Sequence, residues 1–390
     1  MNPESRRIHF VDYLKVLLAM LVVTVHVTLS HGPEVWWFYK SSADIGGMLA
    51  YYQLVGPLCM SLFFLLSAAF FPASFDRKGP ARFLRDRLVR LLIPLVLGFL
   101  TIIIPLHYLY HDRFRDCGAD MPFWTYVKTM FFGIGGRPSM CADPYPAVWP
   151  DLKVAHLWFL QHLIAYSLIY ALVRAVFRKR ARAGTKPAFP KDPAIVAFIG
   201  LTALLVFAVR IRWPLEHWDG FLGVIQAEYG NFPKYAVFFA AGLAAGRFGW
   251  LQTIPPRQGV RWLLIGIALF VAALAASGRW PFILARGGFS WESLVWSAWD
   301  SAMTTALAVG LVGVFRAAVR SRRRFLDVLS ANTYGVYILH VPVVVLWQFA
   351  LQNWQMPVAV RVVLESALGI ASAFLVSMAL RLVPWVRKVI

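Results

Sequence analysis

Histidines within apolar runs are the residues of this sequence best suited to chemistry. His26 lies inside the run from Val22 to Leu29, with apolar or β-branched neighbours on both sides, and His31 follows five residues later. His340 occupies a similar run late in the chain. An imidazole exchanges a proton near neutral pH, so such a histidine could act as a general base. Alternatively, it could hydrogen-bond between helices and contribute only to packing.

Ionisable side chains inside apolar runs indicate a polar pocket, because a charge within a membrane span costs roughly 3 kcal/mol or more. At a helical rise of about 1.5 Å per residue, His26, Asp300 and Glu365 would lie at similar depth in the outer half, with His340 somewhat deeper. His156 would mark the outer mouth. A carboxylate can hold the tautomer of a histidine, so Asp300 or Glu365 could orient His26. The ionisable residues in apolar runs are His26, His162, Asp300, His340, Arg361 and Glu365.

A pair of arginines follows the second apolar run. Arg87 and Arg90 are three residues apart, which puts both guanidinium groups on one face of a helix. Guanidinium groups bind phosphates bidentately, so the pair could hold a phosphate-bearing ligand inside; it could also be a positive-inside anchor or a lipid contact. Asp12 lies about four helical turns from His26 and is expected at the inner face, beside basic residues. These residues indicate group transfer across a membrane, or a transporter.

The composition is that of a membrane protein. Of the 390 residues, 59% are hydrophobic and only 15% are charged, whereas ordinary soluble domains carry about a quarter charged residues. The formal net charge is +20, but no nucleic-acid-binding motif accompanies it, and no cysteine–histidine spacing suits a metal. The basic residues instead occur in bursts between apolar runs, as the positive-inside rule produces.

About ten apolar runs are long enough to cross a bilayer, since a spanning helix needs roughly 20 residues. Ten spans put both termini on one side. Most of the 39 Lys and Arg residues then fall on that side, which indicates that both termini are cytoplasmic. Asp12 and Lys15 interrupt the approach to the first run, so we expect a retained span rather than a signal peptide. The predicted spans are 13–30, 50–71, 90–110, 154–174, 193–210, 233–249, 261–278, 296–316, 331–351 and 359–384.

The longest polar segment, 111–153, is expected outside and carries two cysteines. Cys117 and Cys141 could form a disulfide if this segment faces an oxidising compartment. Three aromatic residues near the end of the first span, Trp36, Trp37 and Tyr39, are interpreted as an outer interfacial belt.

Several motifs occur in order along the chain: Asp12…His26, the stretch FFLLSAAF at 63–70, Arg87-Leu88-Val89-Arg90, and Tyr337-Ile338-Leu339-His340. In these motifs the sequence resembles the membrane acyltransferase-3 family. Within that family it is most similar to the periplasmic glucan succinyltransferase branch, in FVDYLK at 10–15, AHLWFL at 155–160, FFAAG at 238–242 and NTYGVY at 332–337. Lys15 stands where arginine is common in the family, and Ala68 where glycine is usual.

The resemblance implies one all-α transmembrane domain over 1–390, a bundle of about ten helices in the bacterial inner membrane, without a further soluble domain. It implies transfer of an acetyl or succinyl group from cytoplasmic acyl-coenzyme A to a hydroxyl of an extracytoplasmic carbohydrate such as a glucan. No bound cofactor and no metal are implied. Lipopolysaccharide, peptidoglycan, an exopolysaccharide or a small glycoside are alternative acceptors, and the oligomeric state is left open.

The same resemblance assigns roles to the candidate residues. His26 would take the proton of the sugar hydroxyl, and His340 or Tyr337 would stabilise the oxyanion or relay the proton. Arg87 and Arg90 would bind the coenzyme's phosphates. The other candidate substrate contacts are Asp12 and Lys15 at the inner face, His156 and Trp158 as a sugar platform at the outer mouth, and Asp300 and Glu365 beside His26. Arg361 could bind a succinyl carboxylate or pair with Glu365.

Overall fold

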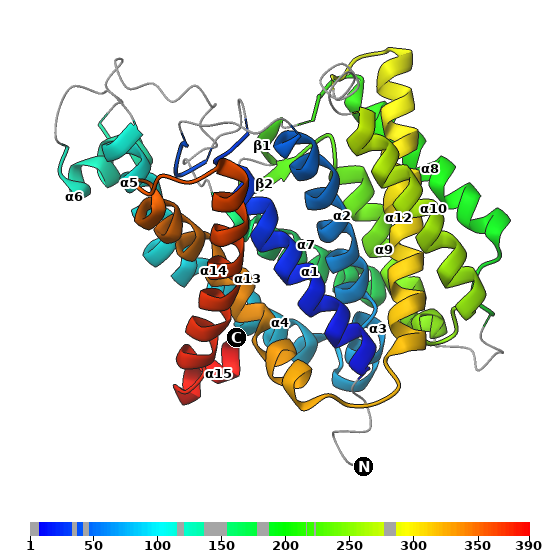
Figure 1. Ribbon diagram of the computed structural model, residues 1–390. Coiled ribbons are helices and arrows are strands. Elements are labelled where there is room, and N and C mark those ends of the chain that lie inside the picture. The colour runs from blue at the N-terminus through cyan, green and yellow to red at the C-terminus, as the bar shows by residue number, and fades with distance from the viewer. Residues whose placement is uncertain are drawn as a thin grey trace.

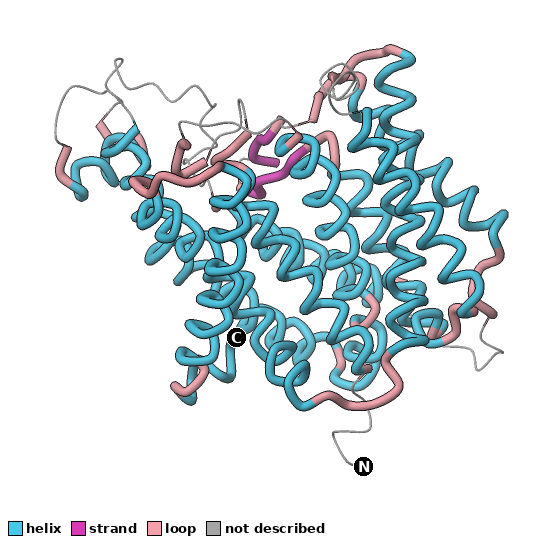
Figure 2. The backbone as a smooth tube through the Cα atoms, viewed as in Figure 1, coloured by secondary structure: helices cyan, strands magenta, loops and turns pink. Residues whose placement is uncertain are grey.

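The chain folds into a bundle of helices with one small β-hairpin (Figures 1 and 2). The computed structural model describes residues 8–32, 37–41, 47–114, 121–135, 154–177, 187–215, 217–221, 224–276 and 286–390. Cys117, Cys141 and Trp36 lie outside these residues. The predicted all-α membrane bundle is confirmed.

The helices account for most of the described residues. The first half of the described chain contains α1 (His9–Thr28), α2 (Met48–Ala68), α3 (Phe71–Lys78), α4 (Pro80–Gly98), α5 (Ile104–Phe114), α6 (Phe123–Tyr126) and α7 (Trp158–Val176). The second half contains α8 (Asp192–Arg210), α9 (Phe232–Phe248), α10 (Pro256–Ala276), α12 (Trp291–Ala318), α13 (Arg324–Leu351), α14 (Val358–Leu380) and α15 (Pro384–Val389). A π-helical turn, Phe99–Ile103, joins α4 to α5, and a 3-10 turn, η5 (Ala155–Leu157), precedes α7.

Nine helical stretches within the described residues are long and apolar enough to cross a membrane. They match nine of the ten predicted spans. The tenth, predicted at 233–249, is α9, which has 17 residues and packs against α2, α3 and α8. The third spanning stretch begins at Pro80 rather than near residue 90, so Arg87 and Arg90 lie within α4.

α1 occupies the centre of the bundle, where it contacts α2, α12, α13 and α14 (Figure 1). Its residues are apolar on nearly all sides because helices surround it. Two buried clusters meet on α1, one through Leu14 and Leu18 and the other through Val16 and Val23. His26 therefore sits on a helix that other helices surround.

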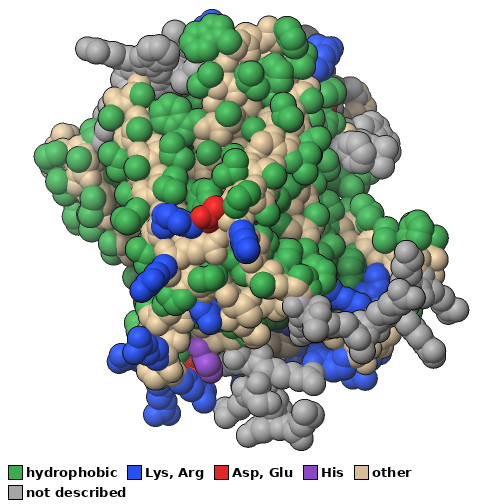
Figure 3. Space-filling model, turned by 90° about the vertical axis from the view of Figure 1, so that its right-hand side faces the viewer, with side chains coloured by type: hydrophobic (Ala, Val, Ile, Leu, Met, Phe, Trp, Pro, Cys, Tyr) green, Lys and Arg blue, Asp and Glu red, His purple; other side chains and the backbone are tan. Residues whose placement is uncertain are grey.

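Both described ends of the chain lie at one end of the bundle, because Ile8 and Ile390 line the same cavity. This agrees with the even number of spans expected from the sequence. Figure 3 shows one side of the molecule covered largely by hydrophobic side chains, with most of its Lys and Arg side chains in the lower half. Assignment of that basic end to the cytoplasm remains a prediction.

α2 and α9 pack at unusually close range. A Cβ atom added at Gly242 of α9 would lie 2.2 Å from the Leu65 carbonyl oxygen, and one added at Gly246 would lie 1.9 Å from that of Ala69. The close approach therefore depends on the glycines of α9.

Replacement of Gly242 by alanine is expected to destabilise the fold by about 1–3 kcal/mol, because the added methyl group meets backbone rather than a movable side chain. Thermal unfolding in detergent measures the effect. Gly200→Ala in α8 is the matched control, since a Cβ there meets nothing within 4 Å. Equal melting temperatures for the two variants would show that the α2–α9 contact is looser than described.

The β-hairpin consists of β1 (Trp218–Phe221) and β2 (Ile225–Glu228). It lies at the end of the bundle opposite the two described chain ends, Ile8 and Ile390 (Figure 1). Gln161 of α7 donates to the Val224 carbonyl at 3.0 Å and accepts from the Gln226 backbone N–H at 2.9 Å. His162 Nε2 hydrogen-bonds to the Gln226 carbonyl at 3.0 Å. His162 thus attaches the hairpin to α7.

The predicted outer aromatic belt is wrong for two of its residues. Trp37 and Tyr39 are only 4% and 5% exposed and belong to the buried core around α1, α13 and α14. The segment bends back into the protein, since the Ser41 backbone N–H donates to the Ser30 carbonyl at 3.1 Å.

Candidate functional site

Three histidines from distant parts of the chain meet near the C-terminal end of α1. His26 Nδ1 lies 3.3 Å from His340 Nε2, and the two ring centroids are 4.7 Å apart. The ring of His156, from η5, lies 5.0 Å from that of His340 and 6.5 Å from that of His26. The structure therefore brings His26 into direct contact with His340, which the depth estimate had placed somewhat deeper.

The backbone carbonyls around these rings determine where their protons reside, because a carbonyl oxygen can only accept. His340 Nδ1 lies 2.7 Å from the Tyr337 carbonyl, so Nδ1 carries the hydrogen and Nε2 is left as an acceptor. His26 Nδ1 lies 2.8 Å from the Val22 carbonyl and likewise carries a hydrogen, which it can share with His340 Nε2. The remaining nitrogen of His26, Nε2, keeps its lone pair. His26 is partly exposed, and none of the described residues hydrogen-bonds to this nitrogen.

His156 belongs to this cluster rather than to an outer mouth, which corrects the expectation from the sequence. It is 6% exposed, and its Nε2 donates to the Ile338 carbonyl at 3.0 Å. Its Nδ1 is buried and finds no partner among the described residues. The preceding Ala155 has a positive φ of 45°, an uncommon conformation for a residue with a side chain. This turn of the backbone brings His156 inward.

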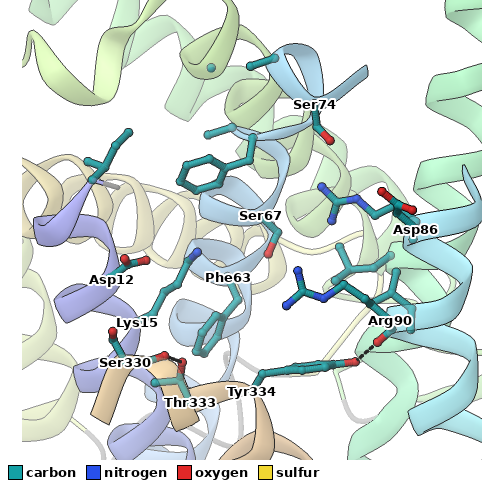
Figure 4. A pocket seen from close by; sticks show the side chains of 18 of the residues that line it. Asp12, Lys15, Phe63, Ser67, Ser74, Asp86, Arg90, Ser330, Thr333 and Tyr334 are labelled. Atoms are coloured by element: carbon teal, nitrogen blue, oxygen red, sulfur yellow. Dashed lines mark hydrogen bonds between the residues drawn. The ribbon is translucent and has the colours of Figure 1, made fainter. Parts of the chain in front are cut away.

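A cavity of about 1230 Å³ opens at the opposite end of α1 (Figure 4). The four residues predicted for the inner face all line it: Asp12 and Lys15 from α1, and Arg87 and Arg90 from α4. In Figure 4 the Lys15 and Arg90 side chains approach the cavity from opposite helices. Four further cations, Arg77, Lys78, Arg381 and Arg387, and two further carboxylates, Asp76 and Asp86, also line it.

Aromatic rings hold the cations in place. The Arg87 guanidinium lies over the Phe71 ring at 4.0 Å, and the Lys15 ammonium lies over the Phe70 ring at 4.9 Å. Such stacking restrains a long side chain while leaving its N–H groups able to bind an anion. The Tyr334 hydroxyl donates to the Arg90 carbonyl at 2.5 Å and ties α13 to α4 (Figure 4). The cavity therefore presents pre-positioned cations to an anionic ligand.

Tyr337 stands between the cavity and the histidines. It lines the cavity, its ring centroid lies 6.2 Å from that of His340, and its hydroxyl donates to the His156 carbonyl. Because that hydroxyl already donates to the His156 carbonyl, Tyr337 lines the cavity and holds the His156 backbone. This replaces the predicted role in oxyanion stabilisation or proton relay.

The predicted carboxylate partners of His26 are wrong. Asp300 accepts from Lys234 of α9 at 2.5 Å, with both side chains buried. Glu365 instead lies 2.9 Å from His31 Nε2, and both of these side chains are fully buried. The carbonyls of Val22 and Tyr337 orient the histidine pair instead.

Two further expectations for the outer half also change. Arg361 donates to the Trp354 carbonyl at 2.6 Å, so it holds the turn before α14 rather than Glu365. Trp158 is 8% exposed and packs among Trp218, Tyr235 and His162. Its ring thus offers no open face to a sugar.

The sequence interpretation did not identify two buried polar residues, Gln348 and Lys234. Gln348 is fully buried and bonds to Trp37, and Lys234 is the fully buried partner of Asp300. The sequence signal that could have identified them is a lysine or a glutamine inside an apolar run. Among the described residues, no group of three or more His, Cys, Asp or Glu side chains could hold a metal ion.

The comparisons with known proteins identify the family of the chain. The family description Acyltransferase domain matches residues 8–382. Neither a curated protein nor a solved structure matches the chain significantly. Since the match covers almost the whole chain, from the cationic cavity to the histidine cluster, the protein belongs to the membrane acyltransferase-3 family and has the general character of a membrane acyltransferase.

Proposed function

We propose that this protein transfers an acyl group, acetyl or succinyl, from cytoplasmic acyl-coenzyme A to a hydroxyl of an extracytoplasmic carbohydrate such as a glucan. The observation that carries the proposal is the placement of two complementary sites at opposite ends of α1. A cavity rich in cations lies at one end, and a histidine with a free ring nitrogen lies at the other.

The separation of the two sites suits the proposed donor. Lys15 and His26 are eleven residues apart on α1, which is about 16 Å along a helix axis. A pantetheine arm contains two amide units and extends about as far as four or five residues of extended chain, roughly 15 Å. Phosphates held by Arg87 and Arg90 would therefore allow the thioester to reach the histidines, with Tyr337 beside its path.

The residues support a simple acyl transfer. The acceptor hydroxyl oxygen attacks the thioester carbonyl carbon while His26 Nε2 takes the hydroxyl proton. The carbon–sulfur bond then breaks, and the imidazolium returns the proton to the leaving thiolate, giving an ester and free coenzyme A. His340 Nε2 accepts the hydrogen of His26 Nδ1 and so steadies the imidazolium.

Reconstituted vesicles test the proposal. Acetyl- or succinyl-coenzyme A is supplied on the side of the cavity and a glucan on the other, and acylated glucan and released thiol are both measured. We expect both products in equal amounts. Movement of a labelled sugar or anion without thiol release would instead support the transporter alternative. Thiol release only with another acceptor, such as lipopolysaccharide or a small glycoside, would change the acceptor and retain the reaction.

A further inference from the structure

A short segment beyond α1 folds back against the His26 ring. Trp37 lies with its ring centroid 5.4 Å from that of His26, and only 4% of its surface is exposed. The neighbouring Phe38 contacts His107 of α5 at 5.2 Å, and Tyr39 contacts Phe349 of α13 at 5.0 Å. The indole is therefore a fixed wall of the histidine cluster.

Gln348 of α13 holds this wall. Its Oε1 accepts from Trp37 Nε1 at 2.8 Å, and its Nε2 donates to Ser30 Oγ at 2.8 Å and to the Val27 carbonyl at 3.4 Å. The side chain is fully buried. One carboxamide thus ties the end of α1, the returning segment and α13 together, with its donors and its acceptor all in use.

The same helix supplies the other neighbour of His26. His340 lies eight residues before Gln348 on α13, about 12 Å along the helix axis. α13 therefore acts on both sides of the His26 imidazole. Its His340 hydrogen-bonds to His26 Nδ1, and its Gln348 holds the Trp37 ring that packs on His26. The aim of the free Nε2 depends on both contacts, and a reacting group displaced by about 1 Å can lose 10²-fold in rate.

We propose that Trp37 and Gln348 are positioning residues that hold His26 in its reactive orientation. They act through His26 and touch neither donor nor acceptor. The inference rests on the proposed function only for its kinetic consequence, because the orientation of the ring can be measured without turnover.

The test compares two tryptophans of this region. Trp37→Phe keeps a ring but removes the hydrogen bond to Gln348, and Gln348→Met removes the other partner with little change in volume. Trp347→Phe is the matched control, because Trp347 Nε1 donates to Ser372 Oγ at 3.0 Å, away from His26. Each variant is purified as the full-length, monodisperse protein. Carbethoxylation of His26 by diethyl pyrocarbonate is followed by mass spectrometry, together with kcat and the donor KM.

We expect Trp37→Phe and Gln348→Met each to lower kcat about tenfold to a hundredfold with an unchanged donor KM. The double variant should have a kcat no lower than that of the less active single variant, since both substitutions break the same contact. The rate of carbethoxylation at His26 should change in both variants and remain at the wild-type value in Trp347→Phe.

Wild-type carbethoxylation in Trp37→Phe, or the same change in Trp347→Phe, would overturn the positioning role. If carbethoxylation changes as expected but the wild-type protein releases no thiol from acetyl- or succinyl-coenzyme A with any acceptor, the positioning of His26 stands and the proposed function fails. The two inferences are therefore tested separately.

Discussion

His26→Gln is expected to lower kcat for acyl transfer by about 10²–10⁴-fold, the usual contribution of a general base, with the donor KM unchanged. Glutamine is close in size to histidine and can still hydrogen-bond to the Val22 carbonyl. It cannot take a proton from the acceptor hydroxyl. The donor's phosphates would bind at the far end of α1, so their affinity should not depend on His26. Steady-state kinetics with the donor and acceptor varied separately measure the effect.

His31→Gln provides the matched control, since the same change is made five residues further along the same stretch. His31 is fully buried and pairs with Glu365 at 2.9 Å, away from the histidine cluster. A glutamine amide can still donate to the carboxylate, so the melting temperature should fall only modestly and kcat per folded molecule should not change. Equal loss of activity in the two variants would contradict a specific role for His26, and an active His26→Gln would direct attention to His340 or His156.

The sequence predicted well which segments form spanning helices and which motif residues lie at the same end of the bundle. Apolar runs of sufficient length became spanning helices because a bilayer sets the length that a helix must have. Motif spacing also placed Asp12, Lys15, Arg87 and Arg90 at one end, and the structure brings all four to one cavity.

The arrangement around the helix axes could not be predicted in the same way. Asp300 and Glu365 were placed beside His26 by depth alone, but depth leaves open the direction in which a side chain points. Each successive residue turns by about 100° around a helix, so residues at equal depth can face different neighbours. Here Asp300 faces Lys234 and Glu365 faces His31.

Local backbone conformation hid the remaining parts of the site. The positive φ of Ala155 turns His156 into the cluster, although the sequence pattern there is an ordinary start of a helix. Trp37 resembles an interfacial aromatic residue by position, yet a single buried carboxamide, Gln348, holds it inside. Long-range hydrogen bonds of this kind leave no periodic signal, because their partners are more than 300 residues apart.

The Arg87→Gln/Arg90→Gln double variant is expected to raise the donor KM by about 10²–10⁴-fold, since each hydrogen bond to a charged group contributes about 1.5–3 kcal/mol. The kcat at saturating donor should remain near the wild-type value, because neither side chain contacts the histidine cluster. Initial rates over a wide range of donor concentration measure both quantities, and the effect should weaken at high ionic strength as salt screens the phosphates.

Arg82→Gln/Arg85→Gln is the matched control on the same helix. These arginines have the same three-residue spacing, but neither lines the cavity. The control removes the same net charge from the same end of the bundle, so it separates a specific phosphate site from a general electrostatic attraction. Similar rises in KM for both double variants would mean that surface charge alone recruits the donor. A lower kcat with an unchanged donor KM would mean that Arg87 and Arg90 support α4 rather than bind phosphate. Other cations of the cavity would then have to hold the donor, and Lys15 would be the first to examine.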